Sequence, residues 1–567
     1  MTPNAASRSA GPSGPSRRGF LASTALATAA VAGGVPLLSA CGGSPSGSGG
    51  GSSAGKDAKK LLPTFVARNV VTPDIPAKNG SAAGFTGELD LATLKTSVPK
   101  KLGKGGEVTV MAPFWGSPPK DDNAYYRAMN DLIGVDVSWQ NQDGNTYDQK
   151  LGAVLASSDV PDLVVIPSWN MGGKIPSAII GKFADLGPHL SGDQVKAYPN
   201  LAAIPTDAWQ RCIFGGKLRG LPLPAAYVTN IVPLYRKDLF DKEGYDIPRS
   251  ADEFMALAKD ITNARAKRWA CLDMKWTAFN NFGVLSGGEK PLGWNLVDGK
   301  LVYRVETEAY LEALEWTRKL FAAGVVHPDA LLGKSSATDP GPKFASGEFL
   351  IYNQDISQWY SRSAEQATQN PDFRVWGMDI WGHDGGDPAP WATQPANLFA
   401  FVNKKASDSV IRDALAVANV TAAPYGTKEY MATNYGVEGT HYTVKDGVPA
   451  KTKQGNTDVL NTFTMIASPA PTIAHPDFPD VTRGMVEWQQ RMGAFTKKST
   501  FYGQQITEPT RYTNLSDNFE QLEDDIVRGR KKISDMQQAV SEWKSKGGDK
   551  LRDWYQKLLD DNGPAQS

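Results

Sequence analysis

The sequence has few of the residues that usually carry out catalysis or bind metal ions. Of its 567 residues, 3 are cysteine and 5 are histidine. Neither His-Glu-x-x-His nor Gly-x-x-x-x-Gly-Lys-Ser/Thr occurs, so the common signatures of zinc proteases and P-loop proteins are missing. The most metal-like pair, His383 and Asp384, lies in a glycine-rich stretch where aspartate is common in turns. We therefore expect no catalytic residue, no bound metal and no cofactor.

An excess of charge of either sign is also missing. The 60 basic residues balance the 60 acidic residues, which gives a formal net charge of +0. A nucleic-acid partner is not expected, because such a partner is usually met by a strongly basic surface. Aromatic residues are plentiful instead, and the 15 tryptophans are the most unusual feature of the composition.

Long apolar runs are missing beyond the amino terminus. No segment after Cys41 approaches the roughly 20 apolar residues that a membrane-spanning helix needs. Before Cys41, the pair Arg17 and Arg18 precedes an apolar, alanine-rich stretch at 21–38 that ends in small residues. Paired arginines are typical of the twin-arginine export route, and small residues before a cysteine are typical of a lipoprotein cleavage site.

A chance apolar amino terminus with a stray cysteine is the alternative. Because two signals occur in the correct order and spacing, we predict that residues 1–40 are a signal peptide and that Cys41 carries lipid. Residues 42–55 are almost entirely glycine and serine, a composition that favours a flexible tether. The predicted location is the extracellular face of the cytoplasmic membrane, with the lipid on Cys41 as the membrane anchor.

The two other cysteines, Cys212 and Cys271, either pair with each other or remain buried thiols. A disulfide suits an extracellular protein, but sequence alone cannot bring two cysteines within bonding distance. A protein exported after folding has less need of a disulfide, so we expect two thiols.

Alternating strand and helix patterns predict an α/β fold for the body of the chain. Apolar runs at 107–112, 135–139 and 163–166 are separated by helical patterns at 123–132 and 147–156. This order is typical of a parallel sheet that helices cover on both faces. Further helices are predicted at 251–262, 309–323, 409–419 and within 513–559, and further strands at 350–352 and 398–402.

Several segments, in the same order along the chain, resemble those of one protein family. They are the lipobox at Cys41 and the stretches 223–240, 248–254, 344–347, 435–442 and 543–548. The chain thereby resembles the family 1 extracellular solute-binding proteins, and among them the long lipoproteins that supply oligosaccharides to ABC importers. The resemblance covers about residues 105–560 and rests on the whole set of segments.

The resemblance implies an α/β periplasmic-binding-protein-like fold with two lobes, a hinge and a ligand cleft between the lobes. It also implies a monomer that performs no chemistry on its ligand and delivers it to the permease subunits of an ABC importer. Some relatives hold a structural calcium ion in an Asp/Asn-rich loop. The corresponding stretch here, 262–271, lacks the alternating oxygen ligands that calcium requires.

The resemblance also suggests a division of the chain. Residues 1–40 are the signal peptide, and 41–104 comprise the lipidated cysteine, the tether and an extended arm. Lobe 1 is expected at 105–235 and again at 396–435. Lobe 2 is expected at 236–395, and 436–567 returns to lobe 2 and the hinge and ends in the C-terminal helices.

A sugar-binding cleft needs aromatic platforms for the ring faces and polar side chains for the hydroxyl groups. In α/β sheets, ligands lie beyond the carboxyl ends of the strands, so aromatic and polar residues in loops beside predicted strands are the candidates. The predicted ligand-binding residues are Trp115, Trp169, Asn170, Tyr227, Trp276, Asn280, Asn281, Asn353, Asp355, Trp391 and Gln394. For each of them, a core position or an ordered surface loop is the alternative.

We therefore expect a lipid-anchored protein that captures a sugar or oligosaccharide when its lobes close. A secreted lipoprotein glycoside hydrolase or other polysaccharide-active enzyme is the first alternative. It would need two facing carboxylates, and 60 acidic residues supply candidates without selecting any. A sensor or adhesin on the same fold is the second alternative.

Overall fold

The computed structural model describes residues 51–52, 56–68, 70–87, 89–229, 231–285, 290–332, 339–367, 369–445 and 447–563. All of them lie within one compact unit, Ser48–Ser567. The predicted signal peptide, Cys41 and most of the predicted tether lie outside the described residues. Among the residues that are described, no helix is both long enough and apolar enough to cross a membrane.

The first lobe is built on a five-stranded sheet with the order β4-β3-β5-β15-β8. The strands β3 (Glu107–Phe114), β4 (Asp136–Asp143) and β5 (Leu163–Pro167) run parallel. Helices α2 (Ala124–Ile133) and α3 (Tyr147–Ala156) connect them, as the sequence pattern predicts. β15 (Ala396–Val402) enters from far along the chain and lies antiparallel between β5 and β8 (Gly220–Pro224).

Local sequence signals fix the ends of α2. The side chain of Asn123 accepts a hydrogen bond from the backbone N–H of Tyr126, which satisfies one of the free donors at the helix start. Gly134 ends the helix in the left-handed conformation (φ 78°), which glycine adopts without steric cost. Between these caps, Tyr126, Met129 and Ile133 are buried on the face that meets the sheet.

The second lobe is built on a four-stranded sheet with the order β10-β13-β9-β14. Its strands are β10 (Trp269–Cys271), β13 (Phe349–Asp355), β9 (Ile231–Arg236) and β14 (Val375–Gly377). β10 is parallel to β13, whereas β9 is antiparallel to both of its neighbours. This mixed sheet and the first sheet form separate hydrophobic cores.

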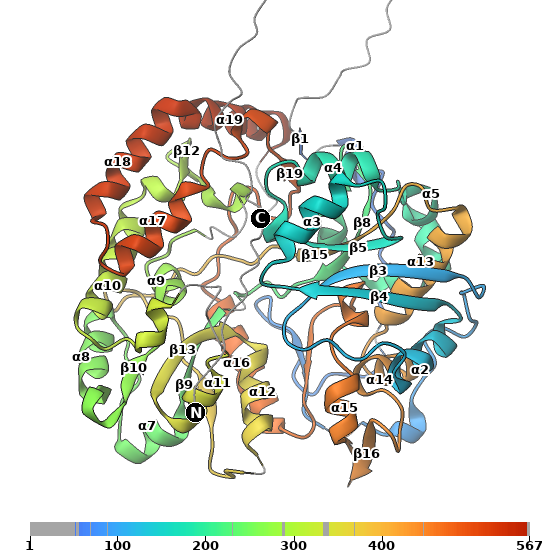
Figure 1. The fold of residues 1–567 in the computed structure, drawn as a ribbon, viewed down its shortest axis with the longest axis horizontal. Coiled ribbons are helices and arrows are strands. Elements are labelled where there is room, and N and C mark those ends of the chain that lie inside the picture. Colours follow the sequence, from blue (N-terminus) through green and yellow to red (C-terminus); the bar gives the residue numbers. More distant parts are fainter. Residues whose placement is uncertain are drawn as a thin grey trace, which may run out of the picture. The chain divides into compact units, whose positions relative to one another are not determined.

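The helices of the second lobe come from three parts of the chain, and the last part, the C-terminal helices (red in Figure 1), packs on α10 (Glu308–Ala322). The C-terminal helices share one core with α10, through Tyr310, Phe519, Met536, Trp543 and Tyr555. The helices of this lobe are α7 (Lys237–Glu243), α8 (Ala251–Ile261), α9 (Lys275–Asn281), α10 (Glu308–Ala322), α11 (Gly341–Ser346), α12 (Ser357–Gln366), α16 (Pro479–Gly493), α17 (Asn518–Val527), α18 (Ile533–Trp543) and α19 (Asp549–Asn562).

From β3 onward, the described chain crosses between the core of the first lobe and the cores of the second at three places; before β3, the arm already contributes Ala82 to a core of the second lobe. The first crossing lies between β8 and β9, and the second lies between β14 and β15. The third lies between Ala467, in the core of the first lobe, and Ile473, in a core of the second. Three crossing segments between two lobes form the hinge of the two-lobed fold.

Two features depart from the division expected from the sequence. That division places β9 mostly in lobe 1, but β9 pairs with β13 and β14 in the second sheet. It places Val459 and Phe463 in the return to lobe 2 and the hinge, but both side chains pack into the core of the first lobe. The other domain boundaries expected from the sequence stay predictions.

The remaining elements belong to both lobes and to the hinge. Cys212 and Cys271 are buried in different cores and are free thiols. The extended arm at 70–87 lies against the hinge, where β2 (Ala83–Phe85) pairs in parallel with β18 (Thr472–Ala474). The other helices are α1 (Lys56–Lys59), α4 (Ile175–Lys182), α5 (Gly187–Leu190), α6 (Thr206–Gln210), α13 (Asp408–Thr421), α14 (Lys428–Tyr435) and α15 (Lys453–Asp458). The other strands are β1 (Gly51–Ser52), β6 (Ile213–Phe214), β7 (Lys217–Leu218), β11 (Trp294–Val297), β12 (Lys300–Tyr303), β16 (Tyr442–Lys445), β17 (Val448–Lys451) and β19 (Ile506–Thr507). Of these, β11, β12 and β19 contribute side chains to a core of the second lobe.

Candidate ligand-binding cleft

Two adjoining cavities lie between residues of the two lobes. Both are lined by Ser168 and Trp169 from the first lobe and by Trp276 from the second. The larger cavity has a volume of about 660 Å³, and the smaller one has a volume of about 430 Å³. Both volumes lie in the range of ligand pockets, roughly 300–1,000 Å³.

We call the larger cavity the polar chamber. From the first lobe, Gly144, Asn145, Asp148, residues 168–173, Pro176 and Arg211 line it. From the other side it is lined by Trp276, residues 303–305, residues 505, 506 and 508, and side chains between 513 and 523.

We call the smaller cavity the aromatic chamber. Its aromatic walls are Trp169, Trp276, Phe279 and Trp391, and its polar wall residues include Thr229, Asn280, Gln394 and Asn397. Large aromatic faces beside a few amides and hydroxyls are what a sugar ring requires.

Trp169 reaches the cleft because the strand before it ends abruptly. All five residues of β5 are buried, and Pro167 stops the strand because proline cannot donate to the sheet. The chain then forms a short 3-10 helix, Ser168–Asn170, in which Trp169 remains 48% exposed. Trp115, which follows β3, is 44% exposed, and its ring centroid lies 6.3 Å from that of Trp169 at an angle of 50°.

Trp276 is presented from the opposite lobe at the start of α9, and it is 39% exposed. Its neighbour Lys275 is buried, and the Lys275 ammonium lies 3.3 Å from a Glu523 oxygen and 2.7 Å from an Asp524 oxygen. The side chain of Asn353 also holds this helix start, because it accepts a hydrogen bond from the Thr277 backbone N–H at 3.0 Å. The position of Trp276 is thus fixed by partners on β13 and α17.

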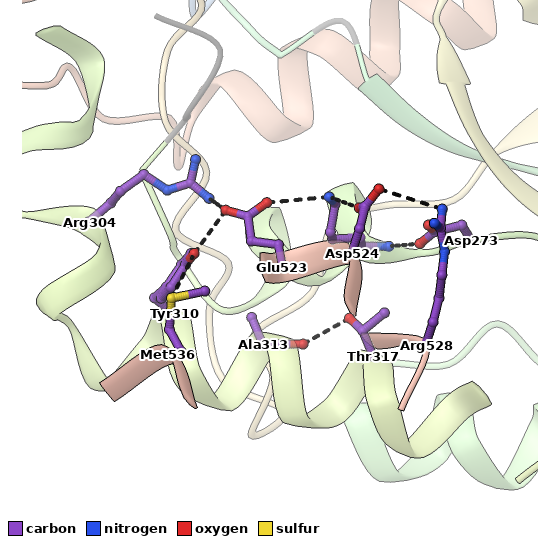
Figure 2. A network of polar contacts seen from close by, with 10 residues as sticks. Asp273, Arg304, Tyr310, Ala313, Thr317, Glu523, Asp524, Arg528 and Met536 are labelled. Carbon is purple, nitrogen blue, oxygen red and sulfur yellow. Dashed lines mark hydrogen bonds and ion pairs between the residues drawn. The ribbon is translucent and has the colours of Figure 1, made fainter. Parts of the chain in front are cut away.

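Glu523 is the centre of a buried polar network beside the polar chamber (Figure 2). It accepts hydrogen bonds from Arg304 at 3.0 Å and from the Tyr310 hydroxyl at 2.9 Å, in addition to its contact with Lys275. Burial lowers the pKa of Lys275, but the nearby Glu523 and Asp524 carboxylates raise it further, so the net shift is upward. Burial raises the pKa of Tyr310 well above its ordinary value. The network therefore holds a charged lysine and a neutral tyrosine in contact with Glu523, which itself lines the polar chamber.

Six of the predicted ligand-binding residues line the two chambers, and Trp115 adjoins them through Trp169. The six are Trp169, Asn170, Trp276, Asn280, Trp391 and Gln394. The Oδ1 atom of Asn170 is buried without a hydrogen-bond partner among the described residues. The indole N–H of Trp391 donates to the Gly283 carbonyl at 2.8 Å, and the buried Gln394 amide bonds to Gly503 and Phe501, so both side chains also hold the cleft wall.

The other four predicted residues are not brought to these chambers. Asn353 holds the start of α9, as described above, and Asp355 accepts hydrogen bonds from the backbone and hydroxyl of Ser357 at the start of α12. Asn281 is buried, with 2% of its surface exposed. Tyr227 lines a separate cavity of about 410 Å³ at the hinge, and its hydroxyl donates to the Thr496 carbonyl. That these four residues contact the ligand stays a prediction.

The charged walls of the polar chamber were not predicted from the sequence. Arg211, Arg304, Glu508, Glu520 and Glu523 line it, but they are single charges among 60 basic and 60 acidic residues. No spacing motif distinguishes them, and only the fold brings them together.

Comparison with known proteins agrees with this architecture. Residues 123–432 match the model of the bacterial extracellular solute-binding protein family. Lipoprotein LipO of Bacillus subtilis (strain 168) is 23% identical over 486 residues, and the alignment covers 80% of this chain and 93% of LipO.

Two solved structures illustrate the similarity in fold. One is the N-glycan transport solute-binding protein NgtS of Streptococcus pneumoniae in complex with Man5GlcNAc, with a TM-score of 0.58 and 15% identity, covering 81% of this chain and 98% of that one. The other is an HMO-binding, ABC-transporter-associated solute-binding protein of Bifidobacterium longum infantis, with a TM-score of 0.58 and 15% identity. The match covers 81% of this chain and 99% of that one. With the family match over more than half of its length, the chain belongs to the bacterial extracellular solute-binding proteins of family 1.

Proposed function

We propose that this protein is the lipid-anchored solute-binding component of a carbohydrate ABC importer. It captures a sugar or oligosaccharide between its lobes and delivers it to the permease subunits. The single observation that carries the proposal is that two half-exposed tryptophans, Trp169 and Trp276, line the same cavities from opposite lobes. A sugar between them stacks on aromatic faces and buries apolar surface on both lobes, which favours the closed state.

The relatives support a carbohydrate as the ligand. One protein of similar fold is an N-glycan transport protein with bound Man5GlcNAc, and another is an HMO-binding protein associated with an ABC transporter. LipO is itself named a lipoprotein, which supports lipid attachment at Cys41. The proposed location is the outer face of the cytoplasmic membrane.

A thermal-shift screen of the full chain against a glycan library tests this proposal, with chromatographic analysis of each glycan after incubation. We expect a subset of glycans to raise the melting temperature and to be recovered unchanged. Stabilisation arises because a ligand that binds only the folded state adds its binding free energy to the free energy of unfolding. Recovery of shortened glycans would instead support a polysaccharide-active enzyme, and a screen without any stabilising glycan would contradict carbohydrate binding.

A further inference from the structure

The extended arm starts on the first lobe. We call residues 66–98, which include the arm at 70–87, the strap. The backbone N–H of Val66 donates to the carbonyl of Ala202 at 2.8 Å. The side chain of Ala202 belongs to the core of the first lobe, so the beginning of the strap moves with that lobe.

The end of the strap is held on the same lobe by one buried side chain. Glu429, on α14, is 2% exposed. It accepts hydrogen bonds from the backbone N–H and the hydroxyl of Ser97, both at 2.8 Å, and from the backbone N–H of Val98 at 3.0 Å. α14 is itself joined to α2 of the first lobe, because the Tyr125 hydroxyl donates to the Thr433 carbonyl at 2.7 Å. Hydrogen bonds to a carboxylate are stronger than those between neutral groups, so this end is firmly attached.

The middle of the strap is bound to the second lobe instead. On α16, the side-chain oxygen of the buried Gln489 accepts a hydrogen bond from the Ala82 backbone N–H at 2.9 Å. The Asn79 side chain donates to the Gln490 carbonyl, and the Gln490 side chain donates to the Pro76 carbonyl, both at 3.0 Å. Ala82 also lies in a core of the second lobe. The strap therefore leaves the first lobe, crosses to α16 and returns.

Close packing adds to these hydrogen bonds. Gly493 ends α16, and a Cβ on this residue would collide with the carbonyl oxygen of Asn79. On the strap, a Cβ on Gly84 would collide with the side chain of Val486. The strap and α16 thus approach each other at positions where only glycine fits, and the middle of the strap moves with the second lobe.

Rotation of one lobe relative to the other must bend, stretch or detach the strap, because its two ends follow one lobe and its middle follows the other. In the described conformation all of these ties are made, and Trp169 and Trp276 line the same chambers. Contacts that are made in one conformation and lost in another shift the equilibrium toward the first. None of the described residues of 66–98 lines either chamber, so the strap acts at a distance from the cleft.

We propose that the strap controls the equilibrium between the open and closed lobes, and that its ties to α16 favour the conformation in which both lobes wall the chambers. This role does not depend on which molecule fills the cleft. It is therefore testable without a ligand and separately from the proposed function.

The distance between two spin labels, one on each lobe, reports this equilibrium. Exposed sites for the labels are Asp131→Cys on α2 and Glu312→Cys on α10. Cys212 and Cys271 are buried, and Cys41→Ala removes the remaining cysteine. Double electron–electron resonance of the full chain without ligand then gives the distribution of distances between the lobes.

The test variant combines Gln489→Ala with Asn79→Gly, which removes two ties to α16. Asn79 has a left-handed backbone (φ 53°), which glycine retains without strain. We expect the ratio of open to closed lobes to rise by about tenfold, as the loss of two hydrogen bonds predicts, and the distance distribution to broaden or to gain a second population. A distribution identical to that of the unaltered strap overturns the proposal.

Glu487→Ala, at an exposed site on α16, is the matched control and leaves the distribution unchanged. Equal broadening in this control would assign the effect to α16 and overturn the proposal as well. Circular dichroism and thermal melting show whether the double variant folds. If it does not, the exposed change Asn79→Gly decides alone, with an expected rise of about fivefold for one lost hydrogen bond, and an unaltered distribution again overturns the proposal.

Discussion

Trp169 and Trp276 lie on opposite lobes, yet each lines both chambers of the cleft. Trp169 follows a buried strand of the first sheet, and Trp276 begins a helix of the second lobe. Any motion of one lobe relative to the other changes the separation of the two indoles. A ligand held by both tryptophans is therefore coupled directly to lobe closure.

Replacing Trp169 by alanine tests the role of the exposed indole. Loss of stacking and of buried apolar area should weaken sugar binding by about 2–3 kcal/mol, on the order of a hundredfold in affinity. Because Trp169 is 48% exposed, the melting temperature should change little. Titration calorimetry measures the affinity, and thermal melting measures the stability.

Trp488→Ala is the matched control for that experiment. Trp488 is fully buried on α16, and its indole N–H donates to the Met378 carbonyl. The change should cost about 3–5 kcal/mol of stability, as large cavities do. A Trp169→Ala protein that melts as early as this control, or that binds sugar with unchanged affinity, would contradict the role of Trp169.

Glu523→Gln should both destabilise the second lobe and weaken binding. Removing one charge from the buried network leaves Lys275 and Arg304 with less compensation, which costs about 3–5 kcal/mol in buried ion pairs. Since Lys275 precedes Trp276, the aromatic platform should also lose its fixed position. Chemical denaturation and calorimetry measure the two effects. Glu312→Gln, at an exposed site on α10, should change stability by less than about 0.5 kcal/mol, and equal losses in both variants would argue against the network.

Gly80→Ala should loosen the arm that lies over the hinge. Gly80 has a left-handed backbone (φ 75°), and a Cβ there would collide with the ring of Tyr227. Gly105 has a similar φ of 80°, but no atom lies within 4 Å of the position that a Cβ would take there. Gly105→Ala should therefore lower the free energy of unfolding only by the backbone strain, about 1–2 kcal/mol. Gly80→Ala should lower it by more, because the clash with Tyr227 adds to the strain. If Gly80→Ala and Gly105→Ala lowered the melting temperature equally, the arm would accommodate the added Cβ without cost, and the prediction would be wrong.

Stability should fall as the pH falls from about 6.5 to about 4 because of His475. Its ring stacks on the ring of Tyr360 with centroids 3.7 Å apart, and the Tyr360 hydroxyl donates to Asp477. Burial lowers the pKa of His475 from 6.5 to about 4. In this window the unfolded chain takes up a proton that the folded chain does not, so acid favours unfolding by at most about 1.4 kcal/mol per pH unit. His475→Phe retains a stacked ring and cannot titrate. Chemical denaturation of both proteins at pH 4.5 and 7 measures the free energy of unfolding, which should change less with pH in the variant. If it changed equally in both proteins, groups other than His475 would cause the pH dependence.

The export signal makes a prediction about location. Replacing Arg17 and Arg18 by lysine should retain the protein inside the cell, because the twin-arginine route recognises the arginine pair. Cys41→Ala should allow export but release the protein from the membrane, without altering sugar affinity. Cell fractionation measures both outcomes, and a Cys41→Ala protein that stays firmly membrane-bound after export would contradict lipid anchoring.

Local sequence was sufficient for much of the first lobe and for the exposed position of Trp169 after β5. Periodic apolar residues between the caps Asn123 and Gly134 specify α2, and the apolar run of β5 followed by proline specifies an exposed loop at Trp169. These features depend on neighbours within a few residues, where spacing and turn chemistry act directly.

The tertiary structure decided the rest of the cleft. Trp276 is held through Lys275 by Glu523, 248 residues further along the chain, and the charged walls of the polar chamber come from segments that carry no shared motif. Asn353 and Asp355 follow the strand that the sequence predicts at 350–352, but in the structure both belong to β13 and their side chains accept hydrogen bonds from nearby helix starts. Contacts between distant segments depend on how the two lobes fold and pack, and the periodicity of nearby residues does not determine that packing.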